Sequence, residues 1–193
     1  MQSTLAVRAT RGLRPQYAAL TDISLIVLGS FFVAAMAQLT IYLPLSPVPI
    51  TGQTFAVLLI GMLFGARRGA ATLLLYIAEG LAGLPVFAGA RAGLATLLGP
   101  TGGYLLGFVA AAYLVGLLAE RGAGKRLFST LLAFIVGSAV IYLFGVVWLS
   151  SFLGWSEALT AGMTPFLLGD VVKALLAALL LPAAWRLLSP DAD

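Results

Sequence analysis

The segment from Leu127 to Leu149, LFSTLLAFIVGSAVIYLFGVVWL, decides the fold because it contains no charged residue and is almost wholly apolar. An α-helix needs roughly 20 apolar residues to cross a bilayer, so this segment is long enough for one crossing. Further charge-free stretches separate Asp22 from Arg67 and Arg91 from Glu120. The sequence therefore predicts an all-α integral membrane protein.

The amino-acid composition also indicates a membrane protein, and it excludes several kinds of chemistry. Of the 193 residues, 61% are hydrophobic and 9% are charged, whereas soluble domains carry roughly 25% charged residues. Because the chain has no His and no Cys, it lacks the residues of the usual zinc, haem and iron–sulfur sites and of Ser-His-Asp catalysis. We expect no metal, no cofactor and no enzymatic activity. The net charge of +4 does not indicate nucleic-acid binding, since the basic residues flank apolar segments.

The chain is predicted to form a single transmembrane domain over residues 1–193. It would comprise a basic cytoplasmic arm over residues 1–20 and a core over about residues 21–188. A Gly-rich segment, residues 86–103, favours an ordered loop or re-entrant turn because glycine permits unusual backbone angles. We expect six membrane-spanning helices, over about residues 23–43, 51–66, 69–83, 104–119, 127–149 and 165–188.

The basic residues give this topology an orientation. Nine of the eleven cations fall on one side of the predicted membrane, and cytoplasmic loops carry an excess of Lys and Arg. Both termini are therefore expected in the cytoplasm, with the protein in the cell membrane. The nine are Arg8, Arg11, Arg14, Arg67, Arg68, Arg121, Lys125, Arg126 and Arg186.

Charges within the predicted helices are the first candidates for a functional site, because an ionisable group at mid-membrane costs about 2.5–3.5 kcal/mol on insertion scales. Asp170 and Lys173 are three residues apart and share one helix face. They would offer a small polar solute one acceptor and one donor, although a purely structural ion pair is the alternative. Glu79 is a third candidate, or it merely faces an outer vestibule.

Four other residues could contact a ligand on the outer side. Gln53 opens the second predicted helix and could offer its amide, or it is an ordinary interfacial residue. Arg91 lies in the Gly-rich loop and could hold an anionic group, or it is simply solvated. The rings of Phe87 and Tyr104 could wall a ligand or belong to ordinary packing.

Small residues recur on the first predicted helix. Ser30 and Ala34 lie on one face at helical spacing, and such strips let another helix approach closely. The spacing alone fits internal packing as well as a partner interface.

Four segments of the chain resemble the BioY family. They are PVPITGQ from Pro47 to Gln53, GLPVFAG from Gly83 to Gly89, LGPTGGYLLGF from Leu98 to Phe108, and DVVK from Asp170 to Lys173. The resemblance covers about residues 20–188. The long Gly-Pro-Thr-Gly-Gly-Tyr block is the most specific part.

The resemblance implies a biotin-specific substrate-binding (S) component of an energy-coupling factor (ECF) transporter. Its partners would be biotin, a transmembrane coupling subunit, two cytoplasmic ATPases and the lipid bilayer, with no nucleic acid. It carries a ligand role over to Asp170, Lys173, Gln53 and Arg91, and a coupling-subunit contact to the small-residue strip with Ser30 and Ala34. Glu79 takes no role from the resemblance. The loop from Ala88 to Gly93 has less glycine than the family pattern.

In the expected site, Asp170 accepts a ureido N–H of biotin, Lys173 donates to a ligand oxygen, and Gln53 or Arg91 meets the opposite polar end. Phe87 and Tyr104 wall the apolar middle. The sequence does not decide which end of biotin faces inward. Three alternative functions stay open: an S component for another vitamin, a small ion or proton channel, and a membrane enzyme.

Overall fold

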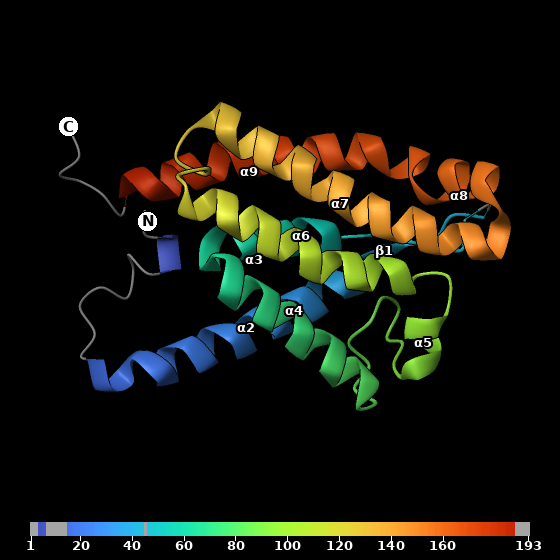
Figure 1. Cartoon of the computed structure of the whole chain (residues 1–193), viewed down its shortest axis with the longest axis horizontal. Helices are drawn as coiled ribbons and strands as arrows, with labels where there is room; N and C mark the ends of the chain where they lie inside the picture. Colours follow the sequence, from blue (N-terminus) through green and yellow to red (C-terminus); the bar gives the residue numbers. More distant parts are fainter. Residues whose placement is uncertain (1–3, 7–14, 45, 188–193) are drawn as a thin grey trace.

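Six main helices run back and forth between two ends of the molecule (Figure 1). The structure is a computed structural model that describes residues 4–6, 15–44 and 46–187. Arg8, Arg11 and Arg14 of the predicted basic arm lie outside the described residues. The six helices are α2 (Ala18–Gln38), α3 (Gln53–Phe64), α4 (Ala66–Leu81), α6 (Gly102–Glu120), α7 (Leu127–Leu153) and α9 (Leu167–Leu187).

The helices confirm a membrane-embedded protein, but not all six predicted crossings. Among the described residues, four stretches are long and apolar enough to span a bilayer: α2, α6, α7 and the stretch Trp155–Leu187. Helix α3 has 12 residues and α4 has 16, fewer than the roughly 20 that a full crossing needs. By length alone, α3 and α4 are therefore too short to cross the bilayer completely.

The first helix ends earlier than the sequence predicted. It was expected to reach Leu43 but stops at Gln38, because the next residues form strand β1 (Thr40–Ile41), which pairs antiparallel with β2 (Ile50–Thr51). The described residues of the Pro-rich segment between these strands, 42–44 and 46–49, form no helix or strand. This small hairpin brings the end of α2 directly beside the start of α3.

Two further short helices occur where the sequence predicted loops. Helix α5 (Leu94–Leu98) lies within the Gly-rich segment, and α8 (Trp155–Gly162) follows a reversal at Gly154. Gly154 has a φ of +83°, a conformation that favours glycine. A 3-10 turn, η2 (Thr164–Phe166), then leads into α9.

The connection between α3 and α4 is a single glycine. Gly65 has a φ of +85°, and the backbone N–H of Ala66 donates to Glu120 Oε1 at 2.9 Å, which satisfies one free donor of the α4 N-terminus. This corner packs directly against Gly116 of α6: a Cβ added there would overlap backbone atoms of Gly65 and Ala66. Close backbone contact without side chains therefore joins α3, α4 and α6.

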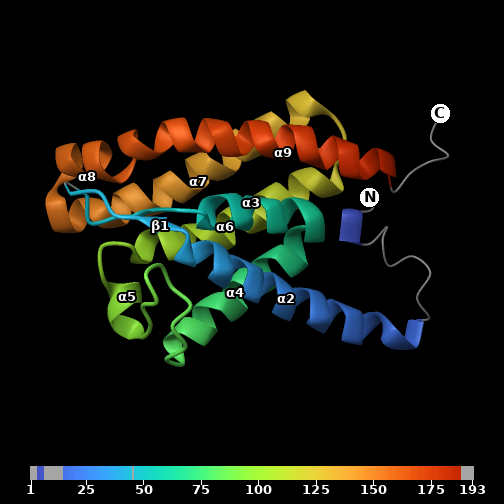
Figure 2. The ribbon, with the colours of Figure 1, turned by 180° about the vertical axis from the view of Figure 1, so that it is seen from behind.

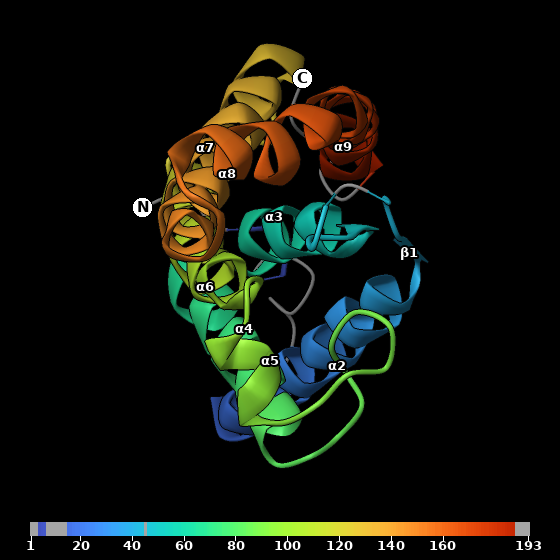
Figure 3. The same cartoon turned by 90° about the vertical axis from the view of Figure 1, so that its right-hand side faces the viewer.

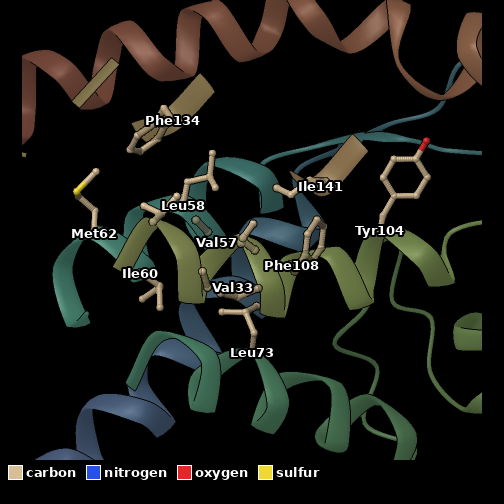
Figure 4. Close-up of a cluster of buried hydrophobic side chains, with 14 of the residues drawn as sticks. Val33, Val57, Leu58, Ile60, Met62, Leu73, Tyr104, Phe108, Phe134 and Ile141 are labelled. Atoms are coloured by element: carbon tan, nitrogen blue, oxygen red, sulfur yellow. The ribbon is translucent and has the colours of Figure 1, made fainter. Parts of the chain in front are cut away.

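The apolar core lies where α3 meets the surrounding helices (Figure 4). Val57, Leu58 and Ile60 of α3 are almost completely buried, as are Phe108 of α6 and Phe134 of α7. Leucines facing away from this centre are exposed, on α7 and α9 above all. Apolar side chains outside as well as inside are what a helix bundle in lipid requires.

The two ends of the bundle differ in charge. The described cations of the predicted cytoplasmic side lie at the end where α3 turns into α4, α6 leads into α7, and α9 ends (Figures 1 and 2). Among them, Arg68 Nη2 lies 2.7 Å from Asp22 Oδ1 and ties α4 to α2. The opposite end carries the β1–β2 hairpin, α5, α8 and the Gly-rich loop (Figure 3).

Gly116→Ala tests the close packing at the Gly65 corner. The added methyl group meets backbone atoms, which cannot rotate away, so the free energy of unfolding in detergent should fall by about 1–3 kcal/mol. Gly169→Ala is the matched control, because an added Cβ there meets nothing within 4 Å. Equal thermal stability of the two variants would contradict this packing.

Candidate functional site

A cavity opens at the loop-bearing end of the bundle. Its empty volume, which includes open solvent at the mouth, is about 680 Å³. Side chains from α3, α6, α7 and α9 form its walls, and the two loops that follow α2 and α4 contribute Val48, Phe87 and Arg91. Segments far apart in the sequence therefore meet around one space.

Asp170 and Lys173 form the polar side of this cavity. Lys173 Nζ donates to Asp170 Oδ1 at 3.3 Å, to Thr54 Oγ1 at 2.6 Å and to the carbonyl oxygen of Thr51 at 3.1 Å. The Lys173 side chain is only 19% exposed and the Asp170 side chain only 12%. All three hydrogens of the ammonium group thus have acceptors, which ties α9 to the start of α3.

Tyr142 is a site residue that sequence reasoning missed. Its hydroxyl donates to Asp170 Oδ2 from α7, while the Thr54 hydroxyl lies 3.5 Å from Asp170 Oδ1. The one tyrosine in a charge-free helix was the available signal, but nothing in the sequence paired it with a residue 28 positions later. Both carboxylate oxygens of Asp170 are therefore engaged within the protein.

Gln53, Tyr104 and Phe87 all line the cavity, and each is fixed by other contacts. Gln53 is 4% exposed, and its Nε2 donates to the hydroxyl of Tyr76 at 2.7 Å. The Tyr104 hydroxyl donates to the carbonyl oxygen of Gly162 at 2.7 Å. Phe87 packs edge-on against Tyr76, with ring centroids 5.5 Å apart. One of the two amide N–H groups of Gln53 is thus committed to Tyr76.

Arg91 lies at the mouth of the cavity, in the turn after α4. Its Cζ lies 5.8 Å from the centre of the Tyr42 ring, within the range of a cation–π contact. No carboxylate pairs with Arg91 among the described residues. Of the two cations lining the cavity, Lys173 is neutralised by Asp170, whereas Arg91 is the one available to an anion.

The structure separates Glu79 from this site. Glu79 is not among the cavity-lining residues and faces α2, where Ser30 Oγ lies 2.9 Å from Glu79 Oε1. Ser30 is 0% and Ala34 9% exposed, so both pack inward against the neighbouring helices. Glu79 thus lies outside the cavity lining, and Ser30 and Ala34 face neighbouring helices of this chain; the ligand role of Glu79 and the partner role of Ser30 and Ala34 stay predictions.

A second, almost wholly apolar groove lies between α7 and α9. It shares Tyr142 and Asp170 with the cavity, and its other walls include Leu143, Val147 and Val171. These flanking side chains are about half exposed on the outer surface of the bundle. Tyr142 and Asp170 therefore line both the cavity and this groove on the outer surface of the bundle.

Comparisons with known proteins agree with this architecture. The sequence profile of the BioY family matches residues 7–190. The chain belongs to the BioY family. It is 40% identical over 153 residues to the probable biotin transporter BioY of Pyrococcus horikoshii, covering 79% of this chain and 89% of that protein. It is 38% identical to the biotin transporter BioY2 of Lactococcus lactis, over 88% of this chain and 93% of the relative.

A solved structure shares the fold of this BioY-family chain. It is described as the S-component for biotin from an ECF-type ABC transporter, and superposes with a TM-score of 0.79 over 90% of this chain and 95% of that one. The sequences are 24% identical. The helix arrangement described above is thus the arrangement of that S-component.

A double-mutant cycle tests the coupling between Asp170 and Lys173. Lys173→Met leaves a half-buried carboxylate without its cation, so the free energy of unfolding should fall by about 1–3 kcal/mol. Adding Asp170→Asn removes that charge, so the double variant should lose less than the sum of the two single variants. Thermal unfolding in detergent measures all four proteins. Additive losses would show that the pair does not interact as its geometry indicates.

Proposed function

We propose that this chain captures biotin from outside the cell and is the S component of an ECF transporter. The observation that carries the proposal is the cavity itself, which joins a polar cluster, apolar walls and an unpaired cation in a chain of the BioY family. The names of the relatives and of the matching structure support biotin as the ligand. The chain would act by binding and carrying, and not as an enzyme.

The chemistry of biotin suits the distribution of groups in the cavity. Biotin has a planar ureido ring with one acceptor oxygen and two N–H donors, an apolar thioether ring and a carboxylate tail. Asp170 would accept a ureido N–H, because a carboxylate can accept about four hydrogen bonds. Lys173 or Tyr142 would give up a contact within the protein to donate to the ureido oxygen. Phe87 and Tyr104 would wall the apolar middle, where exclusion of water strengthens the polar contacts.

Charge then favours one direction for the ligand in the site. The carboxylate of biotin needs a cation, and Arg91 at the mouth lacks an acidic partner among the described residues. Lys173 already has Asp170 beside it. We place the carboxylate at Arg91 and the ureido ring at Asp170, since this arrangement leaves no buried charge unpaired.

The proposal includes the topology and the partners. The cationic end would face the cytoplasm by the positive-inside rule, with both chain termini there and six helices crossing the cell membrane. The cavity then opens to the outside. A transmembrane coupling subunit and two cytoplasmic ATPases would supply the energy for release.

Asp170→Ala tests the site directly. Equilibrium binding of labelled biotin to the purified chain should weaken by about 5- to 150-fold, because a ligand donor loses its acceptor. Glu157→Ala is the matched control: Glu157 is exposed on α8 and does not line the cavity. Unlabelled biotin should displace the label, whereas riboflavin and thiamine should not. Unchanged affinity in Asp170→Ala would remove this residue from the site.

Arg91→Met tests the direction of the ligand. The original chain should bind biotin more tightly than its uncharged amide, because only biotin carries an anion for Arg91. In Arg91→Met that preference should shrink by about 10-fold or more, since a hydrogen-bonded charge pair is lost. A preference that persists unchanged would place the carboxylate elsewhere, with Lys173 as the remaining cation of the cavity.

A further inference from the structure

One side chain outside the cavity holds the turn that covers it. Gln38 is the last residue of α2 and is solvent-exposed. Its amide faces the turn after α4, which supplies Phe87, Ala88 and Arg91 to the cavity lining. Gln38 itself is not among the lining residues, so its contribution would have to pass through this turn.

Gln38 contacts the turn with both ends of its amide group. Nε2 lies 3.3 Å from the carbonyl oxygen of Phe87 and 3.4 Å from that of Val86. On the acceptor side, the backbone N–H of Ala90 donates to Oε1 at 3.0 Å. Nε2 also donates to the carbonyl oxygen of Ala34 at 3.1 Å, on its own helix. Only a carboxamide places a donor and an acceptor at one side-chain tip in this way.

The backbone of the turn needs such support. Gly89 and Ala90 have φ angles of +68° and +56°, and a left-handed conformation is unfavourable for alanine. Within the turn, the N–H of Phe87 donates to the carbonyl oxygen of Arg91 at 3.0 Å. The N–H of Ala90 points away from this pair to Gln38. The contact with Gln38 therefore holds the one strained residue that is not a glycine.

Tyr42, four residues after Gln38, also contacts the 86–91 turn. Tyr42 follows β1, and its ring carries the cation–π contact with Arg91. A Cβ added at Gly89 would overlap the Tyr42 hydroxyl, so the turn and Tyr42 lie in direct contact. Gln38 and Tyr42 thus bracket the turn between Phe87 and Arg91.

We propose that Gln38 is a positioning residue for the ligand site, whose amide fixes the 86–91 turn over the cavity and so slows the departure of the ligand. This inference rests on the proposed function for the identity of the ligand. Its structural part, the fixing of the turn, does not depend on biotin. Phe87 and Arg91 reach the ligand, and Gln38 acts through them.

The test compares Gln38→Met and Gln38→Glu with the original chain. Methionine has a similar shape without polar groups, and glutamate keeps the acceptor for Ala90 but loses the donors. In the ligand-free protein, hydrogen–deuterium exchange of residues 86–91 should quicken about 5- to 30-fold in both variants, since one or two hydrogen bonds of ordinary net strength are lost. Labelled biotin, chased with excess unlabelled biotin, should dissociate faster by a similar factor.

Ser30→Ala is the matched control, because Ser30 lies on the same helix and bonds Glu79 rather than the turn. It should leave both rates unchanged. Original rates in both Gln38 variants would overturn the proposal, as would a rise in exchange spread equally over the turn and the core of α6. If the original chain binds no biotin, the proposed function fails, while the exchange of residues 86–91 still decides whether Gln38 holds the turn.

Discussion

The ion pair between Asp170 and Lys173 is the constraint on which the rest of the site depends. Two charges three residues apart on a helix in lipid need partners, and the bundle supplies them from three other elements: the hydroxyls of Thr54 and Tyr142 and the carbonyl oxygen of Thr51. These contacts fix α9 against α3 and α7. A polar cluster of this kind is costly to assemble in lipid, which favours a role in binding.

The bundle is tightly packed at one end and opens around a cavity at the other. Glycines at Gly65 and Gly116 bring α3, α4 and α6 into backbone contact at the cationic end. At the other end the helices separate around the cavity, and the two loops cover it. The Asp170–Lys173 pair thus lies between the tightly packed end of the bundle and the end that carries the loops. At the loop-bearing end, Gln38 and Tyr42 hold the 86–91 turn in place.

Sequence alone predicted the helical class, the approximate helix positions and the three charged residues that line the cavity, Arg91, Asp170 and Lys173. Charge scarcity singled out Asp170 and Lys173, since an ionisable residue in an apolar helix stands out without any structure. It also singled out Glu79, which the structure places against Ser30 instead. Local sequence cannot show which side of a helix faces a cavity when nearly every side is apolar. For the same reason it could not find Tyr142 or Gln38, whose roles come from residues far along the chain.

A structure of the chain with biotin bound tests the central claim most directly. The account predicts the ureido ring beside Asp170, Tyr142 and Lys173, the carboxylate at Arg91, and the 86–91 turn closed above the thioether ring. Biotin bound anywhere outside this cavity, for example in the apolar groove between α7 and α9, would contradict it.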